Sequence, residues 1–195
     1  MKNENINGHR LFEYLFFRDI SRSHVPVIPL FEAAVGYDFK VDIKSSRHEI
    51  QNDIGELYYN KNENNISLSI PCQLDHYERR YLSACLLGLL LLNLQKSNES
   101  QLNLSFPLHQ LNHENEITKF ADQCLSPETL VKSAWISASE QSSSTRESDE
   151  IAINLLQIPS YVFNRRMDEI YKPRGSETEI NDKLLNDTSD RSRWI

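Results

Sequence analysis

Residues that build metal sites and disulfide frameworks are scarce in this sequence, which has six histidines and three cysteines among 195 residues. The number of cysteines is odd, and no two of them form a CxxC motif; they are Cys72, Cys85 and Cys124. These counts argue against a set of paired disulfides and against a structural zinc knot. The expected compartment is therefore the reducing cytoplasm.

Basic charge is in deficit as well, because 21 lysines and arginines stand against 28 acidic residues and leave a net charge of -7. Proteins that bind nucleic acid through its phosphates usually carry a surplus of lysine and arginine. DNA binding is therefore disfavoured on charge grounds. Glycine is rare too, with five residues, which excludes collagen-like and low-complexity architectures.

Long apolar runs are also missing. The most apolar segment, Leu82 to Leu94, is shorter than the about 20 residues that a membrane-spanning helix needs, and it predicts a buried core helix instead. The first residues, Met1 to Arg10, contain no apolar signal segment. A hydrophobic fraction of 39% is enough for the core of one domain. We expect a globular protein with no membrane partner.

The spacing of apolar residues predicts a mixed set of helices and strands. Helices are expected at 11–20, 29–34, 75–94, 112–125, 127–136, 148–156 and 160–171. Strands are expected at 39–43, 54–59 and 66–70, joined into a small antiparallel sheet with a hairpin at 60–65. Segments 96–105 and 139–145 are polar enough to be a loop and a linker, and 174–195 is expected to be a flexible tail.

Four segments in this order resemble the ImmA/IrrE family of zinc metallopeptidase domains. The active-site helix of that family reads R-F-T-L-A-H-E-L-G-H-L-L-L-H, and Arg80 to Asn93 reads R-Y-L-S-A-C-L-L-G-L-L-L-L-N in the same frame. Val25 to Val41, Glu114 to Pro127 and Glu150 to Tyr171 resemble the family's opening, its next helix and its C-terminal end. The resemblance implies an α+β fold, with a small antiparallel sheet packed on a zincin-like active-site helix.

The same resemblance implies a division of the chain. Residues 1–21 are expected to be an N-terminal helix, and 22–138 a degenerate peptidase-like domain. Residues 139–173 would be a linker and a small helical pair resembling a helix-turn-helix, and 174–195 the tail.

The residues at the implied zinc positions do not have zinc chemistry. In the HExxH motif two histidines on one helix face bind zinc, and the glutamate beside the first one takes a proton from water. Here these positions hold Cys85, Leu86 and Leu89, and only the third-ligand region keeps acids, Glu114 and Glu116. One thiol and one carboxylate do not complete a tetrahedral site. We therefore expect no zinc and no peptidase activity, with the former cleft filled by hydrocarbon.

Two other chemistries remain open at this stage. Cys85 could be a nucleophile, with His76, His109 or His113 as its base. A small buried thiol in a leucine-rich helix is the simpler interpretation, because apolar surroundings raise a thiol pKa. His109 and His113 are four residues apart and could bind a metal with Glu114, although their segment resembles a loop before a helix.

The end of the predicted fold could contact DNA. Segment 150–166 has the layout of a helix-turn-helix, with Arg165 and Arg166 on the second helix as candidate DNA or partner contacts. Between residues 148 and 174, however, basic and acidic residues are equal in number. A DNA-reading element usually carries a basic surplus, so a small helical cap is favoured.

These observations favour one function and leave two alternatives. The favoured one is a catalytically inactive metallopeptidase-like protein that acts by protein–protein interaction, with the former substrate groove and its edge strand as the docking surface. The family context suggests a regulatory, antirepressor role on a phage or mobile element, with a helix-turn-helix repressor as partner. The alternatives are a peptidase with a non-standard site, built on a metal or on Cys85, and a DNA-binding regulator that uses helix 160–171.

Overall fold

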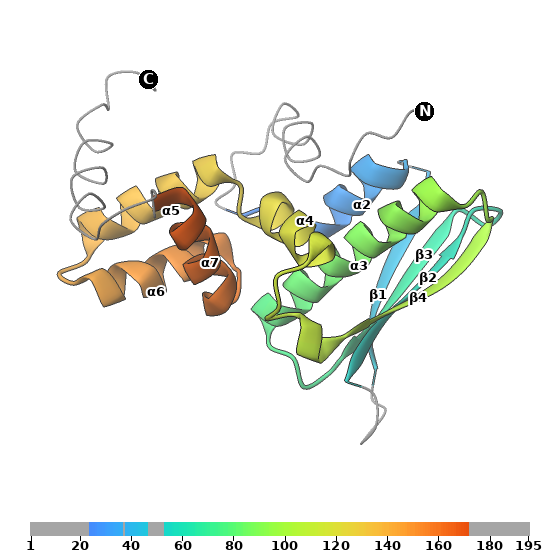
Figure 1. Ribbon diagram of the computed structural model, residues 1–195, viewed down its shortest axis with the longest axis horizontal. Helices are drawn as coiled ribbons and strands as arrows, with labels where there is room; N and C mark the ends of the chain where they lie inside the picture. The colour runs from blue at the N-terminus through green and yellow to red at the C-terminus, as the bar shows by residue number, and fades with distance from the viewer. Residues whose placement is uncertain (1–23, 37, 47–52, 172–195) are drawn as a thin grey trace.

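The computed structural model describes residues 24–36, 38–46 and 53–171 of the chain. This part is an α+β protein with a four-stranded mixed sheet and six helices (Figure 1). The N-terminal helix expected at 11–20 and the tail at 174–195 lie outside the described residues. Within the described part, none of the helices has both the length and the apolar character that crossing a membrane requires.

The elements follow one another in an order close to the expected one. The helices are α2 (Val27–Val35), α3 (His76–Lys96), α4 (Glu116–Leu125), α5 (Glu128–Gln141), α6 (Thr145–Leu156) and α7 (Ser160–Tyr171). The strands are β1 (Lys40–Ser46), β2 (Ile54–Asn60), β3 (Asn65–Pro71) and β4 (Gln101–Pro107). A short 3-10 helix, Leu108–Gln110, follows β4.

The sheet differs from the expected antiparallel one in its strand pairing. Its order is β1-β3-β2-β4, in which β2 runs antiparallel to both β3 and β4, but β1 runs parallel to β3. The hairpin at 60–65 is confirmed as the β2–β3 connection. The parallel pair arises because the hairpin places β3, rather than β2, beside β1. Alternation of apolar residues determines which face a strand buries, and it carries no information on the neighbour.

Strand β4 occupies a segment that was expected to be a polar loop, and that expectation is wrong. Leu102 and Phe106 are buried there, while the side chains of Gln101, Asn103 and Ser105 are exposed. This is the alternation of a strand with one buried face. The polar residues belong to the exposed face, so their number concealed the strand.

Helix α3 is the centre of the fold and begins where the sequence predicted. Asp75 and Glu78 form a capping box, in which the Asp75 carboxylate accepts the Glu78 N–H at 2.8 Å. Nine consecutive helix positions, Arg80 to Gly88, are buried, and so is Leu90. In Figure 1 the labelled helices lie on the α3 side of the sheet, which leaves the opposite sheet face open.

Two contacts at glycines bring the layers together. A Cβ at Gly55 of β2 would lie 2.7 Å from Leu82, and a Cβ at Gly88 of α3 would lie 2.7 Å from the Phe120 ring of α4. At these two positions a larger residue would therefore require the facing side chain, Leu82 or Phe120, to shift.

The linker expected at 139–145 is largely helical. Helix α5 continues to Gln141, and α6 begins at Thr145, with the Ser144 hydroxyl accepting the Glu147 N–H at its start. The boundary predicted after residue 138 thus falls inside α5. Buried Ala138 packs in the core and extends the helix into the serine-rich segment. The bounds predicted for the last helix, 160–171, are confirmed as α7.

Candidate functional site

The three positions of the implied zinc motif lie on α3 and offer little chemistry. Cys85 and Leu86 are fully buried, and Leu89 is half-buried. Neither leucine has an atom that can bind a metal or accept a proton. Burial raises the pKa of the Cys85 thiol well above its ordinary value, which keeps it protonated and weakly nucleophilic. The residues present therefore do not fit a zinc ion.

The acids left in the third-ligand region do not join Cys85. Glu114 and Glu116 are exposed, while Cys85 is fully buried. Glu114 forms an ion pair with Lys119 at 2.7 Å, and the hydrogen bond from Lys119 lowers the pKa of the Glu114 carboxyl. These acids belong to the solvated surface before and at the start of α4.

The histidines considered as bases or ligands are also on the surface. His76 is exposed at the first position of α3, where its Nε2 lies 3.4 Å from the Gln157 side-chain oxygen. His109 and His113 are exposed beside the short 3-10 helix. In the ranges that the structure describes, no three His, Cys, Asp or Glu side chains are grouped closely enough to hold a metal ion.

Beside Cys85 lies a buried polar group that sequence reasoning missed. It consists of Tyr81 of α3, Asp122 of α4 and Arg165 of α7, here called the Asp122 cluster. Arg165 donates through Nε to Asp122 Oδ2 at 2.6 Å and through Nη2 to Asp122 Oδ1 at 2.8 Å. The Tyr81 hydroxyl donates to Asp122 Oδ1 at 2.8 Å and accepts from Arg165 Nη2 at 2.7 Å. The interior beside Cys85, which was expected to be filled by hydrocarbon, therefore also contains a buried ion pair.

The electrostatics of the Asp122 cluster are those of a buried ion pair. Burial raises the pKa of Asp122, and the hydrogen bonds from Arg165 and Tyr81 oppose that rise. Burial alone would lower the pKa of Arg165, but the hydrogen bonds and electrostatic interactions with Asp122 and Tyr81 together outweigh it and the pKa is raised. Burial also raises the pKa of Tyr81, which remains a neutral donor. The cluster fixes α7 against α3 and α4 with a bidentate, charge-assisted contact.

A second buried guanidinium, Arg80, binds backbone instead of a carboxylate. It donates to Val25 O at 2.6 Å, to Leu156 O at 3.2 Å and to Gln157 O. Burial lowers the pKa of Arg80 to about 10, so the group stays charged at neutral pH. The two later carbonyls end α6, where the helix dipole favours a cation. Arg80 thus attaches both the chain before α2 and the end of α6 to α3.

Both arginines that the sequence offered for DNA or partner contact are bound inside the chain. The Arg165 side chain is 14% exposed and the Arg166 side chain 12%. Arg166 donates to Ser126 O at 2.9 Å and pairs with Glu169. Either guanidinium would have to leave these partners to reach a phosphate. The role predicted for them stays untested, but their geometry favours the helical cap.

A signal for the Asp122 cluster was present in the sequence. Asp122 lies in a segment of α4 in which Phe120, Ala121, Cys124 and Leu125 are all buried. The similar segment of the ImmA/IrrE family has alanine at this position. A carboxylate among apolar helix residues indicates a buried partner of opposite charge, although the sequence does not identify which arginine that is.

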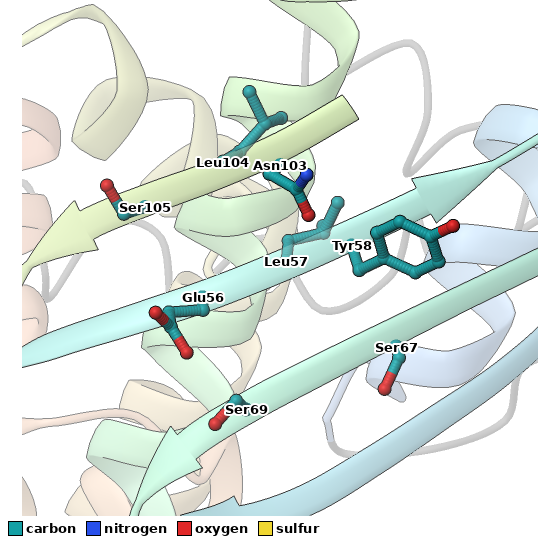
Figure 2. Close-up of a pocket in the computed structure, with 8 residues that line it drawn as sticks. All are labelled: Glu56, Leu57, Tyr58, Ser67, Ser69, Asn103, Leu104 and Ser105. Atoms are coloured by element: carbon teal, nitrogen blue, oxygen red, sulfur yellow. The ribbon is translucent and has the colours of Figure 1, made fainter. Parts of the chain in front are cut away.

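The open face of the sheet has a shallow hollow of about 370 Å³ (Figure 2). Two cross-strand rows form most of its lining, Ser69–Glu56–Ser105 and Ser67–Tyr58–Asn103. Glu56 stands between Ser69 and Ser105 in the first row, and the lining of the hollow is largely polar.

Comparison with known proteins leaves the resemblance without independent support. No protein-family model matches the chain, and no match was found among the curated proteins.

Proposed function

We propose that the chain is a catalytically inactive protein of metallopeptidase-like architecture that acts by binding another protein. The observation that carries the proposal is the environment of α3. Leu86 is a fully buried leucine where the resembling family has its general base, and Cys85 is a buried thiol with a raised pKa. A peptidase needs a group that activates water, and these two residues provide none.

The arrangement of α7 supports a protein partner over a DNA partner. The helix that would enter a DNA groove has its two arginines bound to Asp122 and Ser126 of the same chain. Releasing Arg165 would leave the Asp122 carboxylate buried and unpaired, which is costly. The pair α6–α7 is therefore proposed as a fixed cap on the domain.

The sheet supplies a docking surface that needs no catalytic group. β1 and β4 are the two outer strands, and an outer strand can accept a further strand through its free backbone groups. By analogy with the resembling family, the expected partner is a helix-turn-helix regulator, and the expected role is that of an antirepressor.

The test is to identify the genes beside this one and to mix the purified full chain with any helix-turn-helix regulator that they encode. We expect a stoichiometric complex in size-exclusion chromatography. The regulator should stay intact by mass spectrometry after incubation with zinc, and Cys85→Ala should behave as the wild type. Separate elution of the two proteins would count against the binding role. Zinc-dependent or Cys85-dependent cleavage would favour the enzyme alternative.

A further inference from the structure

The outer edge of β1 presents backbone groups that no described strand uses. β1 pairs only with β3, at the end of the sheet order. The N–H of Lys40 donates to Asn64 O at 2.8 Å, so the backbone groups of Lys40 point toward β3. Because these directions alternate along a parallel strand, the N–H and C=O groups of Val41, Ile43 and Ser45 point outward.

One apolar side chain on this edge is left uncovered. Ile43 is paired with Leu68 across the sheet, and both belong to the face that packs on the helices. Leu68 is fully buried, but Ile43 is 42% exposed. The described helices reach Val41, which packs against the core, but they leave Ile43 uncovered. A partner strand at this edge would bury the Ile43 side chain and satisfy its backbone groups together.

The charges of β1 select the kind of strand that fits. Lys40 and Lys44 are exposed on the open face, and Asp42 between them pairs with Lys40 at 3.1 Å. This leaves a positive edge on a chain of net charge -7. Antiparallel pairing of two β1 strands around Asp42 sets Lys40 against Lys44 and Asp42 against Asp42, whereas pairing around Ile43 sets Asp42 against Lys44. A dimer of the chain in size-exclusion chromatography would therefore count against an acidic partner segment at this edge.

We propose that the β1 edge binds an extended acidic segment of the partner protein as an added antiparallel strand. The partner residues opposite Lys44 and Lys40 are acidic and four positions apart. The residue opposite Ile43, directly after the first acid, is apolar. The inference rests on the proposed function, since it names the surface and the chemistry by which the protein binds its partner.

The structure provides a variant that removes one edge hydrogen bond and leaves the sheet intact. Proline at position 43 deletes an N–H that points away from β3, and proline is tolerated in an outer strand at such a position. A proline control at Ile28 is unsuitable, because Ile28 lies in helix α2. The control for the apolar contact therefore compares threonine substitutions at the two exposed isoleucines, Ile43→Thr on the edge and Ile28→Thr on the helix. Ile28 is 44% exposed and lies on α2 instead of the edge.

The first experiment is a fluorescence-anisotropy titration of the full chain with a labelled peptide T-E-V-T-T-E-T. We expect saturable binding, weakened by about tenfold or more in Ile43→Pro and in Lys40→Glu/Lys44→Glu. Ile43→Thr should weaken binding more than Ile28→Thr does. The peptide T-K-V-T-T-K-T should bind only to the Lys40→Glu/Lys44→Glu variant. Equal binding of the two peptides to the wild type would overturn the proposal.

Circular dichroism checks that each variant is folded. If Ile43→Pro fails to fold, the variant Lys40→Glu/Lys44→Glu still tests the proposal.

A second measurement separates this proposal from the function on which it rests. The same variants are mixed with the helix-turn-helix regulator. A complex that survives both Ile43→Pro and Lys40→Glu/Lys44→Glu would overturn the β1 site and leave the binding role standing. Loss of the complex in both variants, with unchanged thermal stability, would support the site. If the wild type forms no complex, the binding role fails, and the peptide titration alone decides on the edge.

Discussion

At the scale of single residues, Asp122 is the decisive side chain. Its carboxyl is buried among apolar residues of α4 with a side chain 2% exposed, and it retains its charge only because Arg165 and Tyr81 bind it. A buried ion pair contributes little net stability compared with an apolar pair, but breaking it leaves one charge uncompensated. The cluster therefore specifies how α7 docks more than it stabilises the fold.

This asymmetry predicts the outcome of a double-mutant cycle. Asp122→Leu and Arg165→Met should each lower the free energy of unfolding by about 3–5 kcal/mol, because each leaves a buried partner uncompensated. The double variant Asp122→Leu/Arg165→Met should lose much less than the sum. Chemical denaturation measures all of these.

The surface ion pair Glu114–Lys119 is the matched control for that cycle, and Glu114→Gln should leave unfolding unchanged because exposed pairs are screened by solvent. Additive losses in the double variant would show that the cluster residues act independently.

The cysteines predict a simple chemical result. Cys72 is exposed, whereas Cys85 and Cys124 are buried and burial raises the pKa of both thiols. An aromatic disulfide reagent should modify Cys72 rapidly in the native protein and all three thiols only after unfolding. Cys72→Ser should abolish the rapid phase. Rapid modification of Cys85 in the native state would instead support a thiol-based enzyme.

At the scale of the elements, the contact between α3 and α4 depends on the small size of Gly88. The Phe120 ring fills the space where a side chain at position 88 would stand. This contact brings Asp122, two residues further along α4, within reach of the Tyr81 hydroxyl. Formation of the Asp122 cluster therefore depends on the close packing of α3 against α4.

Two opposing effects decide the result of Gly88→Ala. Alanine gains about 1 kcal/mol from helix propensity, but a Cβ 2.7 Å from Phe120 Cδ1 forces a rearrangement that costs about 1–3 kcal/mol. We expect a net loss of stability in chemical denaturation. Phe120→Leu combined with Gly88→Ala should recover part of that loss, since the smaller side chain frees the space. An increase in stability for Gly88→Ala alone would contradict this packing.

At the scale of the whole molecule, the helical side and the β1 side differ in how far their groups are paired within the described part of the chain. The helical side is closed by contacts from α3 to the end of α6 through Arg80 and to α7 through Arg165. Among the described residues, the β1 side ends in backbone groups that no strand uses and in an exposed isoleucine. The structure therefore directs the search for a partner away from the helix that resembles a DNA reader and toward the edge of the sheet.

The sequence by itself determined most elements and the residue types at the positions that resemble a zinc motif, because both depend on local properties. The period of apolar residues and the Asp75 capping box define α3, and Cys85, Leu86 and Leu89 are simply not the residues of a zinc site. Strand β4 was the main local error, since its exposed polar residues concealed its alternation.

Only the tertiary structure decided which segments meet. The parallel pairing of β1 with β3, the inward direction of Arg165 and the cluster at Asp122 join residues 25 to 84 positions apart in the chain. Such contacts depend on how helices and strands pack in three dimensions, and no local pattern encodes them. For the same reason, the free edge of β1 became visible only when the order of the strands was known.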